Sequence, residues 1–155
     1  MRLIVRSSPI HAAGVFTLEA VPKGARILEY TGERLVHEQA DKLYADRPYT
    51  YLFGVGDGVH VIDGYGMSMY VNHSCRPNCE TVEDDEHRVW ITAMRDIEPG
   101  EELTYDYLLY DGEGEAPCTC GAANCRGTMY SKKELRKKKE AAAANGHGGR
   151  KRRSA

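Results

Sequence analysis

With 155 residues, of which 41% are hydrophobic, the chain is long enough for one compact domain with its own core. The net charge of -2 hides two opposite parts, because residues 1–131 hold eleven Lys and Arg against twenty-one Asp and Glu, whereas residues 132–155 hold ten against two. No apolar run is long enough for a transmembrane helix, and the first residues lack the apolar stretch of a signal peptide, so a membrane protein is excluded and a reducing compartment is expected.

Three short candidate strands begin the chain. They are Leu3–Val5, Gly14–Leu18 and Ala25–Tyr30, and Gly32 ends the third. The segment Leu35–Leu43 is the one convincing helix expected within the core.

The middle of the chain contains further short candidate strands. Thr50–Val55 and His60–Ile62 are predicted to form a hairpin across Gly56–Gly58, and Val89–Ala93 is a later strand. Many short strands at short spacing predict a mostly β fold of the α+β class.

Past Ser131 the composition changes to a basic tail. Lys132–Ala144 could be helical, but Leu135 is its only large apolar anchor, and Asn145–Gly149 is expected to be disordered. A flexible, solvated end is the simpler interpretation, and contact with nucleic acid through this tail is the alternative.

The cysteines form a pattern typical of a metal site. The chain has five of them, Cys75, Cys79, Cys118, Cys120 and Cys125. The last three form a CxC pair and, after four intervening residues, a further Cys, and thiolates spaced in this way can converge on one ion. Zinc prefers four tetrahedral ligands, so the fourth must come from Cys75, Cys79 or, as a weaker candidate, His73. Structural thiols or a disulfide pair are the alternatives.

Two short motifs lie on either side of the strand-like run Arg88–Ala93. Asn72–Asn78 has the sequence NHSCRPN, and Glu102–Tyr107 has the sequence ELTYDY. In this order and spacing they resemble the SET domain, the fold of many lysine methyltransferases, and the resemblance covers about Ser7–Tyr130. It implies several short curved β-sheets with a knot-like crossing, few short helices and a C-terminal, zinc-bound post-SET segment.

The resemblance extends to the cysteine cluster, which looks like the post-SET motif. It implies that the fourth metal ligand is Cys75, beside Cys118, Cys120 and Cys125, and that Cys79 is a free thiol. The expected domains are 1–110 (SET), 111–131 (post-SET zinc segment) and 132–155 (tail). A structural zinc would contribute folding energy, because the post-SET segment has little core of its own.

The ten tyrosines suit methyl transfer to lysine. The attacking amine must be neutral, although a free lysine has a pKa of about 10.4, and a buried channel lowers that pKa. Tyrosine rings stabilise cationic groups, and their hydroxyls orient the amine. The resemblance implies Tyr107 as the principal active-site tyrosine, Tyr30 as a second and Tyr105 at the product-specificity position, which predicts mainly monomethylation. For each of them, a core tyrosine with a satisfied hydroxyl is the structural alternative.

A cofactor pocket follows from the same resemblance. It implies that S-adenosylmethionine is held by Ala13, Gly14, Val15, Tyr51, Tyr70, Asn72, His73 and Tyr130. Two positions depart from the family pattern. Ala12 replaces the first glycine of a Gly-x-Gly sequence and would serve in its place only with a negative φ, and Met69 stands where a basic residue is frequent.

The sequence thus predicts an S-adenosylmethionine-dependent protein-lysine methyltransferase. The acidic residues 1–131 favour a lysine-rich, histone-like protein as substrate, although charge that only keeps the domain in solution is the simpler account. A catalytically silent module that binds lysine-rich peptides or protein partners is the alternative, and a zinc-dependent nucleic-acid binder fits only the tail. We expect a monomer or homodimer in a bacterial cytoplasm, with a nuclear or chromatin-associated location as the alternative.

Overall fold

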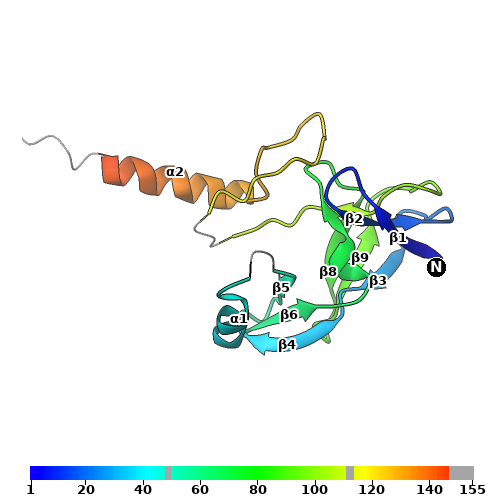
Figure 1. The fold of residues 1–155 in the computed structure, drawn as a ribbon, viewed down its shortest axis with the longest axis horizontal. Coiled ribbons are helices and arrows are strands. Elements are labelled where there is room, and N and C mark those ends of the chain that lie inside the picture. Colours follow the sequence, from blue (N-terminus) through cyan, green and yellow to red (C-terminus); the bar gives the residue numbers. More distant parts are fainter. Residues whose placement is uncertain (48–49, 111–113, 147–155) are drawn as a thin grey trace, which may run out of the picture.

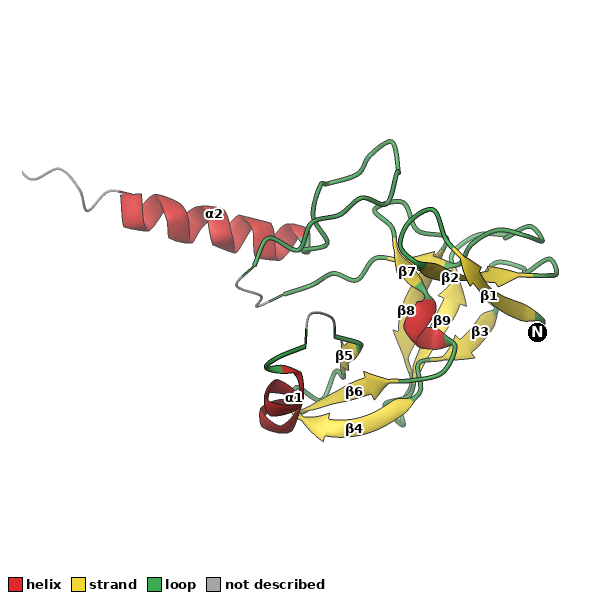
Figure 2. Ribbon diagram, viewed as in Figure 1, coloured by secondary structure: helices red, strands yellow, loops and turns green. Residues whose placement is uncertain are grey.

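The computed structural model describes residues 1–47, 50–110 and 114–146 as a set of small β-sheets with two α-helices (Figure 1). Its strands are β1 (Leu3–Ser7), β2 (Ala13–Thr17), β3 (Arg26–Glu29), β4 (Gly32–Val36), β5 (Leu52–Gly54), β6 (His60–Gly64), β7 (Asn72–His73), β8 (Cys79–Glu83), β9 (Val89–Ala93) and β10 (Thr104–Tyr105). The helices are α1 (His37–Tyr44) and α2 (Lys132–Gly146), with a 3₁₀ turn at Ser68–Tyr70. The predicted mostly β class is confirmed, as Figure 2 shows by its yellow strands.

The strands form four separate sheets among the described residues. β1 pairs with β2, β7 pairs with β10, and the two three-stranded sheets have the orders β3-β9-β8 and β4-β6-β5. The main core gathers fully buried side chains from β2, β9 and the adjoining loops, among them Val15, Val21, Ile91, Ile97 and Leu103. Because no sheet is large, this shared core is what holds the sheets together.

The predicted hairpin is confirmed, since β5 and β6 pair antiparallel with Phe53 opposite Ile62. The first three strands and β9 also form close to the predicted bounds. The start of the helix was wrong, because Leu35 and Val36 belong to β4 and the helix begins at His37. Leu35 pairs with Val61 of β6 and is buried against it, so a tertiary contact overrides the local pattern.

Strand β8 was not predicted. It pairs with β9 over its whole length, from Cys79 opposite Ala93 to Glu83 opposite Val89. Its sequence, CETVE, alternates weakly and carries two acids, so only its partner β9 makes it a strand.

Helix α2 extends away from the sheets in Figure 1. Asn145 and Gly146 belong to this helix, so the expected disorder of Asn145–Gly149 is wrong for these two residues, and 147–149 lie outside the described residues. The helix is anchored at its first turns, where Glu134 is buried and Lys138 Nζ lies 3.8 Å from the centre of the Tyr130 ring. Within the described residues, no helix combines the length and the apolar character needed to cross a membrane.

Candidate active site and metal centre

The two sequence motifs meet in the smallest sheet. β7 and β10 run parallel, with Thr104 opposite Asn72 and Tyr105 opposite His73. Asn78 fastens the crossing, because its side-chain amide donates to the Glu102 carbonyl at 2.8 Å and its carbonyl oxygen accepts the Thr104 N–H at 2.9 Å. Segments about thirty residues apart in sequence therefore present their side chains to one place.

A cavity of about 680 Å³ lies beside the paired motifs. Its lining brings together eight predicted catalytic and cofactor residues, Ala13, Tyr30, Tyr51, Tyr70, Asn72, His73, Tyr105 and Tyr107. Ile10, Phe53, Leu109 and Met129, which the sequence analysis did not single out for the site, also line it. The volume is within the range of small-molecule sites, so these eight candidates share one space of suitable size.

Aromatic rings make up one part of this lining. The ring centres of Tyr105 and Tyr107 are 4.8 Å apart, those of Tyr30 and Phe53 are 5.2 Å apart, and those of Phe53 and Tyr105 are 6.4 Å apart. Gly64 permits the position of Tyr30, because a Cβ at Gly64 would meet the Tyr30 hydroxyl at 2.6 Å. A chain of rings is thus available to surround a slender aliphatic group with a cationic end.

The hydroxyls of these tyrosines are neutral and largely fixed. Tyr30 donates to the Tyr51 carbonyl at 2.8 Å, and Tyr107 donates to the Val71 carbonyl at 3.0 Å. Burial raises the pKa of Tyr107 to about 12 and raises the pKa values of Tyr30 and Tyr105 above their ordinary range. These groups can therefore orient a substrate by hydrogen bonds, but they are not bases near neutral pH.

Asn72 belongs to a polar network behind the cavity that the sequence analysis missed. Its side-chain amide donates to Glu102 Oε1 at 2.8 Å and to the Ala13 carbonyl at 2.9 Å, and Ser8 Oγ donates to Glu102 Oε1 at 2.8 Å. Gly14 leaves room for this carboxylate, because a Cβ there would meet Glu102 Oε1 at 2.1 Å. Glu102 thus fixes the Asn72 side chain. Its position at the start of the second motif is the sequence feature that could have identified it.

Three predicted cofactor residues, which the structure describes, do not line the cavity. They are Gly14, Val15 and Tyr130. Val15 is completely buried in the core. The Tyr130 hydroxyl donates to the Gly114 carbonyl at 2.9 Å, and its neighbour Met129 faces the cavity instead. The roles proposed for these three residues therefore do not follow from contact with the cavity.

Ala12, the first departure from the family pattern, lines the cavity with a φ of +36°. The negative φ that would let alanine replace glycine without strain is thus not adopted. A left-handed backbone costs a residue with a Cβ about 1–2 kcal/mol. The loop nevertheless closes, because the Ser8 N–H donates to the Ala12 carbonyl at 3.2 Å. Met69, the second departure, also lines the cavity.

The structure brings together one set of four cysteines. The sulfurs of Cys75, Cys118, Cys120 and Cys125 all lie within 4.8 Å of one another. The sulfur of Cys118 is 3.8 Å from that of Cys75 and 3.7 Å from that of Cys125. Four sulfurs at about 2.3 Å from one tetrahedral zinc would lie about 3.8 Å apart, so the cluster has the size that zinc requires.

This geometry separates Cys75 from Cys79 as the fourth ligand. Cys79 is completely buried in the main core, and burial raises the pKa of its thiol to about 12, as expected of an inert thiol. The four-cysteine cluster is surrounded by backbone donors. The N–H of Cys75 points to Cys120 Sγ at 3.4 Å, and the N–H of Arg126 points to Cys75 Sγ at 3.3 Å. Such donors stabilise thiolates.

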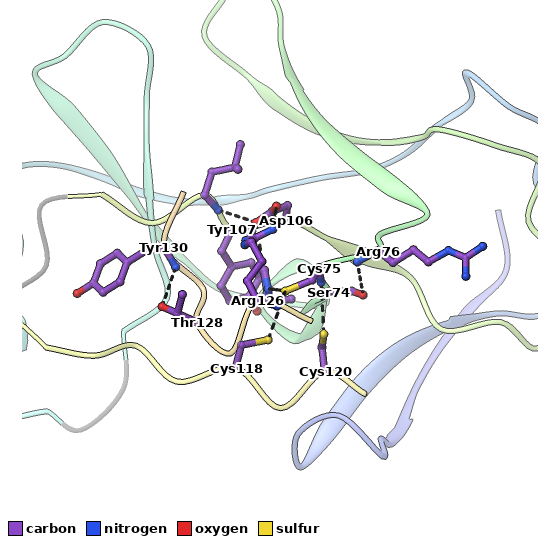
Figure 3. A network of polar contacts seen from close by, with 12 residues as sticks. Ser74, Cys75, Arg76, Asp106, Tyr107, Cys118, Cys120, Arg126, Thr128 and Tyr130 are labelled. Carbon is purple, nitrogen blue, oxygen red and sulfur yellow. Dashed lines mark hydrogen bonds and ion pairs between the residues drawn. The ribbon is translucent and has the colours of Figure 1, made fainter. Parts of the chain in front are cut away.

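The cysteine cluster is connected to the tyrosines, as Figure 3 shows. Arg126 donates two hydrogen bonds to the Asp106 carboxylate, at 2.7 and 2.8 Å, which ties the cysteine segment to the second motif. His73 lies between the two sites, because its Nδ1 accepts the Tyr107 N–H at 3.1 Å and its Nε2 lies 3.4 Å from Cys75 Sγ.

Burial lowers the pKa of His73, so the ring is neutral. Its proton is then on Nε2, facing the sulfur of Cys75, because Nδ1 is occupied as an acceptor. Cys118, Thr119 and Cys120 also line the large cavity. The cysteine segment is therefore both a candidate metal site and part of the active-site lining.

Comparison with known proteins agrees with this geometry. Residues 12–108 match the model of the SET domain. The chain is 37% identical over 138 residues to "Histone-lysine N-methyltransferase, H3 lysine-4 specific" of Aspergillus oryzae, covering 79% of this chain and 11% of that protein.

Two further relatives have a comparable sequence identity to this chain. The chain is 39% identical over 141 residues to "Histone-lysine N-methyltransferase TRX1" of rice, covering 83% of this chain and 14% of that protein. It is also 39% identical over 136 residues to "Histone-lysine N-methyltransferase, H3 lysine-4 specific" of Saccharomyces cerevisiae, covering 79% of this chain and 12% of that protein. The chain thus spans only 11–14% of the length of these three relatives.

Proposed function

The chain belongs to the SET-domain family and carries a post-SET-like cluster of four cysteines, and from this we propose that it transfers a methyl group from S-adenosylmethionine to lysine in a histone or histone-like protein. The observation that carries the proposal is the single cavity in which Tyr30, Tyr105 and Tyr107 meet Asn72 and His73.

In this proposal the cofactor supplies an activated methyl group. Asn72, His73 and Ala13, with Tyr51 and Tyr70, would hold it, as their places in the lining allow. The chain itself binds the lysine side chain among aromatic rings, excludes water from it and orients its amine by neutral hydroxyls. A low-dielectric site lowers the pKa of the amine, so lysine enters as a neutral nucleophile without a dedicated base.

The four cysteines would hold a structural zinc. Their sulfur separations fit that ion, and zinc would supply no chemistry to the reaction beyond fixing the segment that carries Cys118 and Cys120. Nearby backbone N–H groups support their thiolate forms, as the contacts to Cys75 and Cys120 indicate.

For the substrate, the names of the relatives favour histone H3, and lysine 4 is the first residue to test. The charge of -10 on residues 1–131 would steer a basic tail toward the site. These relatives come from fungi and a plant, so they do not support a bacterial cytoplasm, and we expect a nuclear or chromatin-associated location.

We propose monomethyl-lysine as the main product. The Tyr105 hydroxyl has no hydrogen-bond partner among the described residues, and its ring lines the cavity. It is therefore available to hold the amine, or a water, where further methyl groups would need room.

The first experiment incubates the protein with labelled S-adenosylmethionine and histone octamers, with the products identified by mass spectrometry. Tyr107→Phe should lower the rate by about a hundredfold, since it removes a fixed hydroxyl from the reacting amine. Tyr65→Phe is the matched control, because Tyr65 is 64% exposed and does not line the cavity. Equal rates for both variants would contradict the proposed role of Tyr107.

A silent binding module remains the competing function. Thermal stabilisation by S-adenosylmethionine separates the two, because a ligand that binds the native state raises its stability. Peptide binding with neither stabilisation nor label transfer would favour the silent module.

A further inference from the structure

A second, smaller cavity lies next to the first and has no role in the reaction described above. Its volume is about 330 Å³, and it is lined by Phe53, Gly54, Val55, Gly56, Thr81, Glu83, Val89 and Tyr110. That volume is at the lower end of the range for ligand sites and is enough for about one long side chain.

The two cavities share a wall and two flanking segments. Phe53 lines both cavities. On one side, β5 passes from the large cavity at Leu52 to the small one at Gly54. On the other side, the segment after β10 passes from Leu109 in the large cavity to Tyr110 in the small one.

These two segments approach each other closely. A Cβ at Gly54 would meet the Tyr110 hydroxyl at 2.5 Å, so a side chain at this position would displace the phenol. Figure 1 shows the segment after β10 passing above β5 in the same part of the molecule.

The spacing of the cavities matches an extended peptide. β5 is one of the two edge strands of its sheet, so an extended chain can lie along it. Moving from Leu52 to Gly54 spans two residues, which is about 7 Å in a strand. In an extended peptide, side chains two residues apart point to the same side and are separated by that same distance. A lysine inserted past Phe53 would thus place a side chain two positions away at the small cavity.

The small cavity offers groups that recognise a cation. Glu83 Oε2 accepts the Gly56 N–H at 2.8 Å, and Oε1 contacts the ring Nδ1 of His87, so the carboxylate is held in place. The contact with His87 lowers the pKa of Glu83, which is therefore ionised near neutral pH. Tyr110 lines the same cavity with its aromatic side chain and is 53% exposed. A carboxylate and an aromatic ring in one cavity make a suitable site for arginine, which forms paired hydrogen bonds and stacks on rings.

We propose that this cavity binds a second basic side chain of the substrate, two residues from the target lysine, through Glu83 and Tyr110. The inference rests on the proposed function, because it assumes that a lysine occupies the channel beside Phe53. It defines the substrate class more narrowly as proteins with paired basic residues at this spacing.

The test is peptide binding, measured by fluorescence polarisation without any catalytic step. Synthetic eleven-residue peptides carry a central lysine and one arginine, placed two residues before it, two residues after it or five residues before it. All three have the same net charge, so general attraction to the acidic domain is equal. The proposal expects about tenfold tighter binding for one of the peptides with arginine two residues away, as for one added charge-assisted hydrogen bond.

Glu83→Gln should abolish this preference, because the amide can still accept the Gly56 N–H but carries no charge. Glu86→Gln is the matched control, since its side chain is 72% exposed and does not line the cavity, and it should keep the preference. Tyr110→Leu should reduce the preference severalfold.

Equal affinity for the three peptides, or an equal loss of affinity in Glu83→Gln and Glu86→Gln, would overturn the proposal. Failure of the proposed function is recorded separately by label transfer. A positional preference without methyl transfer would support the basic subsite and reject the proposed methyltransferase function. Methyl transfer without a positional preference would support that function and reject the subsite.

Discussion

The two halves of the candidate active site are held in place by different forces. Asn72 and Tyr105 lie in β7 and β10, and Tyr30 and Tyr107 follow shortly after β3 and β10. They adjoin the main core, whose residues Val15 and Leu103 are completely buried. Residues 114–131, all described, contain no helix or strand and only isolated bridges such as Pro117 with Thr128. The first half is organised by the hydrophobic core, whereas the second depends on the cysteine cluster, and a cavity lined by both is complete only when both are ordered.

Removal of the proposed zinc is the largest expected effect, and it should separate the two halves. A chelator, or Cys118→Ser, should weaken S-adenosylmethionine binding at least about tenfold and reduce methyl transfer to background, because the segment with Cys118 and Cys120 lines the cavity. Calorimetry should show a largely retained unfolding transition of the β core.

The control is Cys79→Ala, which changes a buried core thiol outside the cluster. This variant should keep about one zinc per chain by metal analysis, whereas Cys118→Ser should lose it. Unchanged cofactor binding in a preparation shown to be free of metal would contradict the dependence of the second half on zinc.

The next effect concerns the ion pair that joins the halves. Arg126→Gln leaves the Asp106 carboxylate, which is 21% exposed, without its paired donors, and should lower the free energy of unfolding by about 2 kcal/mol in zinc-containing buffer. Chemical denaturation measures this change.

Arg2→Gln is the matched control, because Arg2 is 73% exposed in its pair with Glu19 and its loss should cost far less stability. If the two variants lose the same stability, the Arg126–Asp106 pair does not hold the halves together.

In the half of the site that carries the tyrosines, we expect a smaller effect on the methylation rate but a clear effect on the distribution of methylated products. Tyr105→Phe should raise the share of di- and trimethyl-lysine while retaining most of the first-methylation rate, since only one hydroxyl is removed. Mass spectrometry of a histone H3 peptide reads the product distribution, and an unchanged distribution would reject the assigned role.

The smallest effect tests the strained loop beside the cavity. Ala12→Gly should leave stability unchanged or raise it by up to about 1 kcal/mol, because relief of the left-handed backbone offsets the added freedom of the unfolded chain. Ala13→Gly is the paired control, since Ala13 is in β2, where glycine should cost about 0.5–1 kcal/mol. Thermal denaturation compares them, and an equal loss in both would show that Ala12 stores no strain.

Much of the fold and of the site could be predicted, because some features are local in sequence. The hairpin of β5 and β6 follows from apolar runs around glycine, and the cysteine cluster follows from its spacing. The two motifs were recognisable together, by their order and spacing, since each carries its candidate residues within a few positions.

The rest depended on partners distant in the chain. Leu35 belongs to a strand because Val61 pairs with it, and the polar strand β8 exists because β9 lies beside it. Glu102 was missed because its partners, Ser8 and Asn72, come from other segments.

By itself, the sequence determined that this is a mostly β chain with the SET motifs, ten tyrosines and a cysteine cluster lacking one ligand. The tertiary structure decided that Cys75 completes the cluster while Cys79 lies in the core, that Ala12 takes a left-handed backbone, and that Phe53 separates two cavities. The reason is physical, since residue spacing fixes which groups are neighbours along the chain, whereas burial, strain and cavities arise only when distant segments pack together.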